Sequence, residues 1–204
     1  MEKIEMNTDL LNLWADAAFD TASRHGFHNA HYGETYYMGL VLSEVGEIIN
    51  ADRKGKHADL EAYEAEVKTT VYHRLAFESY IKDTVEDEFA DVVIRLLDFA
   101  GASHVTLEYI GEEERDEAFR QSYDYNYSVA NGLLPGLLYG VTGLTYRVKE
   151  WRKDHNMLSS ILASYVAAYD YLFTGSKNAS MLWTYVKLKM AYNMGRPKFN
   201  GKQY

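Results

Sequence analysis

The sequence predicts an all-α protein, organised as a helical bundle. Only two prolines occur among the 204 residues, Pro135 and Pro197. Because proline disrupts helix interiors and is common in loops, this scarcity favours long helices with short connections. Apolar residues recur three and four positions apart over long stretches, which is the period of a helix with one buried face. No Asn-Gly or Asp-Gly pair lies between the alternating segments that form β-hairpins.

The expected helices cover residues 8–25, 34–54, 60–80, 83–101, 129–153, 158–173 and 178–193. Gly26, Gly55 and Gly101 stand at the ends of three of them, where glycine commonly terminates a helix. Asp83 and Glu86 have the spacing of a capping box, so we expect the fourth helix to begin at Asp83.

The composition excludes several classes of function. The chain carries 30 acidic and 21 basic residues, a net charge of −9, which disfavours general binding to nucleic acid. Cysteine is absent, which excludes disulfides, thiolate nucleophiles and Cys-ligated zinc. The N-terminus has no apolar segment like that of a signal peptide, and no stretch is apolar enough for a confident membrane span. We therefore expect a cytoplasmic protein without a membrane partner.

Two acidic pairs suggest a metal site. Glu44 and Glu47 are three residues apart in one expected helix, and Glu88 and Asp91 are three apart in another. Residues at this spacing project from one face of a helix. If the two helices pack antiparallel, four carboxylates meet, and they must then be protonated or bind cations. Oxygen ligands without Cys or His nearby suit Mg²⁺ or Mn²⁺.

Other interpretations of these acids remain open. The chain contains seven acidic pairs at this spacing, so the spacing alone is weak support. The acids at 88, 91 and 98 could form an exposed polar stripe with Arg95. We expect Arg95 to pair with an acid on its own helix face; the alternative is that it binds phosphate. With such a stripe, the protein would be a non-catalytic helical interaction protein. Against this, the small residues Gly46 and Ala90 lie within the two pairs and would permit close helix approach. A di-iron centre is disfavoured because no histidine follows a Glu by three residues.

Residues 42–47, 88–98 and 189–202 resemble the motifs of the MazG-like family of all-α nucleoside triphosphate pyrophosphohydrolases. The family carries a Glu-x-x-Glu pair on one helix and a Glu-x-x-Asp pair on the next. The resemblance implies a Mg²⁺-dependent, or Mn²⁺-dependent, hydrolase that converts a nucleoside triphosphate to the monophosphate and pyrophosphate. A dimeric dUTPase-like or dCTPase-like enzyme is the close alternative. A homodimer or homotetramer is also implied.

The resemblance assigns roles to particular residues. The metal ligands are expected to be Glu44, Glu47, Glu88 and Asp91, with Glu47 also orienting or deprotonating the attacking water. The basic residues near the C-terminus supply positive charge and polar contacts for the triphosphate; the expected substrate-binding residues are Lys189, Asn193, Arg196 and Lys202.

The expected organisation has three parts. Residues 1–110 form the MazG-like catalytic helices, residues 111–194 add helices that pack on this bundle, and residues 195–204 form a basic tail. The second half could be a degenerate repeat of the first, because residues 39–41 and 136–138 match at an offset of 97. The acids at 44 and 47 are not retained at this offset, so the second half would serve as a packing partner.

Overall fold

The structure, a computed structural model, describes residues 3–30, 32–115, 134–135, 138, 142 and 156–198. Within these residues the protein is all-helical, as the sequence predicts, and contains no strand. The main helices are α1 (Thr8–Arg24), α2 (Glu34–Arg53), α3 (Leu60–Val67), α4 (His73–Tyr80), α5 (Val85–Ser103), α9 (Asn156–Leu172) and α10 (Leu182–Met194). The described part of the chain has no helix that is both long and apolar enough to cross a bilayer.

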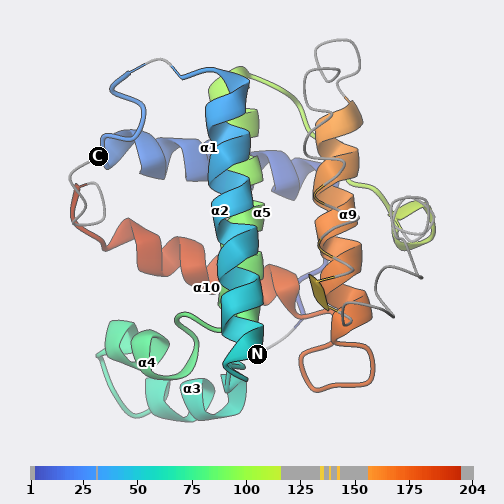
Figure 1. Cartoon of the computed structure of the whole chain (residues 1–204). Helices are drawn as coiled ribbons and strands as arrows, with labels where there is room; N and C mark the ends of the chain where they lie inside the picture. The colour runs from blue at the N-terminus through green and yellow to red at the C-terminus, as the bar shows by residue number, and fades with distance from the viewer. Residues whose placement is uncertain are drawn as a thin grey trace.

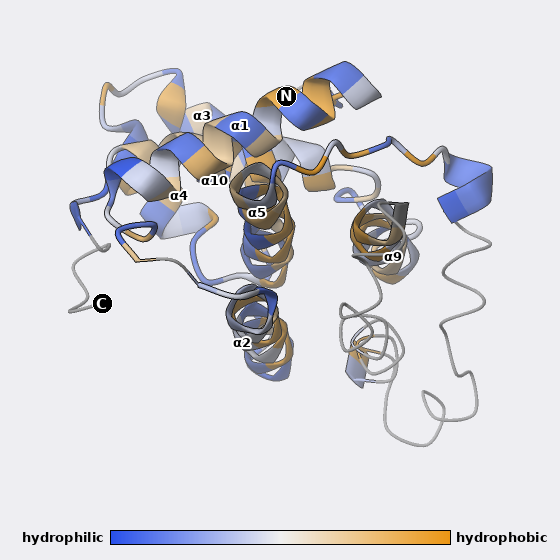
Figure 2. Cartoon of the chain, turned by 90° about the horizontal axis from the view of Figure 1, so that it is seen from above, coloured by the Kyte–Doolittle hydropathy of each residue, from blue (hydrophilic) through white to orange (hydrophobic). Residues whose placement is uncertain are grey.

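Helix α5 is the central element of the bundle. Helix α2 packs along one side of α5, and α1 and α10 cross the opposite side at steep angles (Figure 1). Helices α2 and α5 run antiparallel. Accordingly, Tyr37 near the start of α2 stacks on Phe99 near the end of α5, with ring centroids 4.9 Å apart. Seen end-on in Figure 2, each of these two helices has a hydrophilic side and a hydrophobic side, and α9 lies beside α5.

Contacts on several sides explain the composition of α5. Its apolar residues, including Phe89, Val92, Val93, Leu96 and Leu97, are fully buried. Because neighbouring helices also enclose its remaining faces, most of the acids of α5 are buried as well; they are Glu86, Asp87, Glu88 and Asp98. Ionised groups are rarely buried without partners, so these acids need countercharges or hydrogen bonds.

A glycine in α5 allows α1 to approach closely. A Cβ atom placed on Gly101 would lie 2.6 Å from Cβ of Phe19 and 2.9 Å from the backbone oxygen of Ala15. The expectation for Gly46 is wrong, because a Cβ atom there would meet nothing within 4 Å. The close helix contact therefore lies between α1 and α5, and not at Gly46 in α2.

Several predicted boundaries are confirmed and others are wrong. Gly26 and Gly55, with φ values of 91° and 63°, follow α1 and α2 as expected of helix-terminating glycines. The expected helix at 60–80 is instead two short helices, α3 and α4. The expected helix at 129–153 and the possible repeat fall mainly outside the described residues.

The start and end of α5 also differ from the prediction. Thr84 is the N-cap, and its hydroxyl accepts from the Asp87 N–H at 3.3 Å. Asp83 precedes the cap with a φ of 60°, and Glu86 points into the core. The helix continues past Gly101, and His104 takes the left-handed conformation at its end. The capping-box spacing therefore identified the correct region but the wrong residues.

Candidate metal centre

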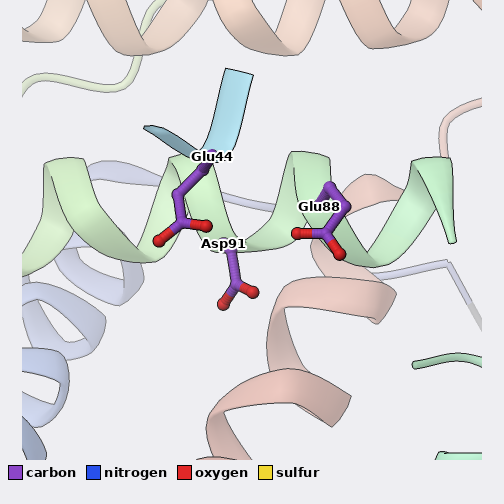
Figure 3. A group of neighbouring side chains, drawn as sticks. All are labelled: Glu44, Glu88 and Asp91. Carbon is purple, nitrogen blue, oxygen red and sulfur yellow. The ribbon is translucent and has the colours of Figure 1, made fainter. Parts of the chain in front are cut away.

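Three carboxylates converge between α2 and α5. Glu44 comes from α2, and Glu88 and Asp91 come from successive turns of α5. One carboxylate oxygen from each lies within 4.8 Å of the others, and Figure 3 shows the three groups gathered beside α5. We call these residues the acidic triad. The spacing of three on α5 and the antiparallel packing on α2 together place them, as the sequence predicts.

Apolar residues determine which way the acids of α2 point. Val41, Val45 and Ile48 are buried against the core, and this sets the rotation of α2 about its axis. Glu44 lies on the edge of the same face and is only 7% exposed. Glu47 lies further round the helix and is exposed. Sequence spacing predicted that both would face the site, whereas Glu44 alone joins the triad.

Two cationic side chains hold two members of the triad. Arg95 Nε donates to Glu44 Oε1 at 2.9 Å, and Lys189 Nζ lies 2.7 Å from Asp91 Oδ2. The expectation that Arg95 pairs with an acid on its own helix is wrong, because its partner belongs to α2. Among the described residues, the carboxylate of Glu88 has no hydrogen-bond or ion-pair partner.

The site carries more negative charge than these cations neutralise. Burial, followed by the charge of Asp91, raises the pKa of Glu88 from 4.5 to about 8. Burial and Asp91 also raise the pKa of Glu44, although Arg95 acts against them. These directions mean that the folded protein resists ionisation of Glu44 and Glu88. Three hard oxygen donors with uncompensated charge are chemically suited to a divalent cation such as Mg²⁺.

Glu47 remains within electrostatic reach of the triad. Its charge contributes to raising the pKa of both Glu44 and Glu88. Because its carboxylate is exposed, it is accessible to solvent at the margin of the site. Glu47 is therefore not one of the three converging acids, but it lies close enough to affect their pKa values.

A second acidic group adjoins the triad. Carboxylate oxygens of Asp83, Asp87 and Glu88 also lie within 4.8 Å of one another, so Glu88 belongs to both groups. Lys82 pairs with Asp83, and Lys189 Nζ lies 2.7 Å from Asp87 Oδ2. The sequence analysis did not identify Asp87. Asp87 lies four residues before Asp91, and this spacing alone would have predicted that both are on the same face of the helix.

The predicted substrate-binding residues have different surroundings. Lys189 is buried in ion pairs with Asp87 and Asp91. Asn193 lines a cavity with Arg95 and Asp98, and its buried Oδ1 has no hydrogen-bond partner in the described part of the protein. The guanidinium of Arg196 lies 5.8 Å from the centroid of the Tyr192 ring.

The last of these four residues, Lys202, lies outside the described residues.

The acidic residues of α5 do not form an exposed stripe. Glu88 and Asp98 are only 4% and 5% exposed. Asp98 Oδ1 lies 2.7 Å from His28 Nε2, and His28 Nδ1 lies 3.1 Å from the hydroxyl of Tyr37. This polar chain borders a cavity of about 500 Å³ with aromatic walls. The interpretation of these acids as a solvated surface is therefore wrong for Glu88 and Asp98.

Comparison with protein-family models, curated proteins and solved structures finds no match for this chain. The geometry of the acidic triad and the sequence motifs are therefore the basis for any functional conclusion.

Proposed function

We propose that this protein is a Mg²⁺-dependent nucleoside triphosphate pyrophosphohydrolase, which converts a nucleoside triphosphate and water to the monophosphate and pyrophosphate. The observation that carries the proposal is the convergence of Glu44, Glu88 and Asp91 within 4.8 Å. Glu44 and Glu88 are buried beside Asp91, and a bound cation would offset the cost of ionising them there. The resemblance of these motifs to the MazG-like family supports the choice of reaction.

The triad would hold the divalent ion through its carboxylate oxygens. A bound ion supplies charge neutralisation for phosphate oxygens and lowers the pKa of a water molecule. Exposed and close to the triad, Glu47 accepts the proton that the attacking water loses. Water attacks the α-phosphorus, the bond from this phosphorus to the oxygen that bridges it to the β-phosphorus breaks, and pyrophosphate leaves. The chain's contribution is mainly positioning and charge.

A small cavity of about 50 Å³ adjoins Arg95, the ion-pair partner of Glu44. Asp98 and Asn193 also line this cavity, whereas the three triad residues are not among its lining residues. Asp98 lies seven residues beyond Asp91, or roughly 10 Å along the helix axis at 1.5 Å per residue. The unpartnered Oδ1 of Asn193 is an acceptor for a donor group of the substrate.

The activity is tested by incubating the purified protein with Mg²⁺ and a panel of canonical and damaged nucleoside triphosphates, including dUTP and dCTP. We expect release of pyrophosphate, and the panel distinguishes a broad pyrophosphohydrolase from the dUTPase-like or dCTPase-like alternative. The MazG-like resemblance also implies a homodimer or homotetramer, which sedimentation of the same sample measures.

Substitutions test the assignment of residues. Glu47→Ala and Asp91→Ala should each abolish Mg²⁺-dependent pyrophosphate release while circular dichroism shows unchanged helicity. Glu113→Ala, the same change at an exposed acid, is the control and should retain activity. Full activity in either site variant would refute the assignment of that residue. Failure to bind Mg²⁺ or Mn²⁺ at all would instead favour a helical interaction protein.

A further inference from the structure

We propose that the ammonium group of Lys189 fills a second cation position beside the acidic triad, so that the centre accepts one divalent ion and not two. The proposal rests on the metal site assigned above and specifies its stoichiometry. It also gives Lys189 a role different from the contact with the triphosphate that the sequence motif implies.

The two acidic groups together have the form of a site for two cations. Glu88 belongs to both, as a carboxylate shared between adjacent ions would. In the second group, however, a cation is already present. Lys189 Nζ lies 2.7 Å from Asp87 Oδ2 and 2.7 Å from Asp91 Oδ2. The ammonium therefore bridges the two groups at the point where a second divalent ion would have to bind.

The surroundings keep Lys189 in this position. Its side chain is 5% exposed, and Nζ lies 5.9 Å from the centroid of the Phe77 ring. Asp87 is 1% exposed, and its Oδ1 has no hydrogen-bond partner among the described residues. Separating Lys189 from Asp87 would leave a buried charge without a partner, which is strongly unfavourable. Lys189 is thus poorly placed to leave the acids for a substrate phosphate.

The charge balance agrees with one divalent ion. Five carboxylates make up the two groups: Glu44, Asp83, Asp87, Glu88 and Asp91. Three cationic side chains pair with them: Lys82, Arg95 and Lys189. Two negative charges remain, which one divalent ion neutralises. A second divalent ion would give these groups a net positive charge, which is unfavourable because most of them are buried.

The ammonium differs chemically from the ion that it replaces. It donates hydrogen bonds and carries a single charge, but it has no open coordination position for water. The centre would therefore contain one Lewis acid, at the triad, and a permanent cation beside it. Removing the ammonium should open the second position to a metal ion.

The stoichiometry is measured without substrate by titrating the 204-residue chain with Mn²⁺ at pH 8 and following free Mn²⁺ by electron paramagnetic resonance. We expect one ion per wild-type chain and two per Lys189→Ala chain. Lys177→Ala is the matched control, because Lys177 pairs with Asp59 and Glu61 at the surface, and it should bind one ion. Lys189→Gln, whose amide can still donate to Asp87 or Asp91, replaces Lys189→Ala if circular dichroism shows that the alanine variant is unfolded.

The outcomes separate this proposal from the proposed function. Two ions bound to the wild-type chain, or one ion bound to the folded Lys189 variant, would overturn the role of Lys189 and leave the acidic triad intact as a metal site. No ion bound to the wild-type chain would refute the metal site itself, and with it the proposed function.

Discussion

At the scale of single residues, Glu88 combines burial with a shortage of countercharge. It is 4% exposed, and among the neighbouring charges Asp91 has the largest effect on its pKa. Arg95 and Lys189 pair with the other two acids of the triad, Glu44 and Asp91. Folding therefore favours the protonated form of Glu88, whereas metal binding requires its ionised form.

The raised pKa of Glu88 predicts that the metal-free protein loses stability as the pH rises. Below about pH 4.5 the Glu88 carboxyl is protonated in both states. Between pH 4.5 and 8 it ionises in the unfolded chain while the folded protein keeps it protonated, so rising pH favours unfolding. The loss levels off above pH 8 and amounts to a few kcal/mol, at about 1.4 kcal/mol for each pH unit between the two pKa values.

Glu88→Gln tests this prediction, because glutamine cannot ionise. In chelator, denaturant titrations should show a higher free energy of unfolding for Glu88→Gln than for the wild-type chain at pH 9, and little difference at pH 4.5. The same variant should lose Mg²⁺ binding. Glu113→Gln, at an exposed position outside the site, is the control for stability. An equal response of the wild-type chain and Glu88→Gln to pH would contradict the assigned cause.

At the scale of helices, the contact between α1 and α5 depends on Gly101. Ala15 and Ala18 of α1 are buried and small, and the missing side chain of Gly101 leaves space for Phe19. Close approach of two helices at small residues is sensitive to a single added methyl group, because packed interiors have few voids. This contact holds α1 on the side of α5 opposite α2.

Gly101→Ala should therefore destabilise the protein by about 1–3 kcal/mol, the usual cost of overpacking. Gly39→Ala is the matched control, because Gly39 is exposed in the interior of α2 and a Cβ atom there would meet nothing within 4 Å. That change should stabilise the helix by roughly 0.5–1 kcal/mol. Chemical denaturation monitored by circular dichroism compares the two. Equal effects of the two substitutions would argue against a close contact at Gly101.

At the scale of the whole molecule, a buried polar network joins segments that are far apart in the chain. Glu86 Oε2 accepts from the Ala58 N–H at 2.9 Å, and Glu86 Oε1 accepts from Asn178 Nδ2 at 2.5 Å. Asn178 Oδ1 in turn accepts from the hydroxyl of Tyr185, and the Asn178 backbone oxygen accepts from that of Tyr169. The network ties α9 and α10 to the start of α5, where the acidic triad begins.

Asn178→Ala should lower the free energy of unfolding by about 1–3 kcal/mol, because it leaves buried hydrogen-bonding groups of Glu86 and Tyr185 without their partner. Asn50→Ala, at an exposed position of α2, should change it little. Thermal and denaturant unfolding of both variants would measure the difference. A change no larger than that of Asn50→Ala would show that the network contributes little to stability.

Much of the local structure follows from the sequence, because it depends on neighbouring residues. Helical periodicity and the scarcity of proline predict the all-α class, and Gly26 and Gly55 mark helix ends because glycine readily adopts positive φ. The spacing of Glu88 and Asp91 places them on one side of α5 for the same local reason. The division of residues 60–80 into two helices was missed, because nothing as strong as a glycine or proline marks the break.

The sequence by itself therefore determined the helical class and the residue types available for a metal site. Only the tertiary structure decided that Arg95 pairs with Glu44, 51 residues away, and that Lys189 pairs with Asp87, 102 residues away. It likewise excluded Glu47 from the triad. These outcomes depend on the axial rotation of each helix and on which elements become neighbours. Both are set by burial of apolar surface across the whole chain, and the spacing of the acidic residues by itself specifies neither.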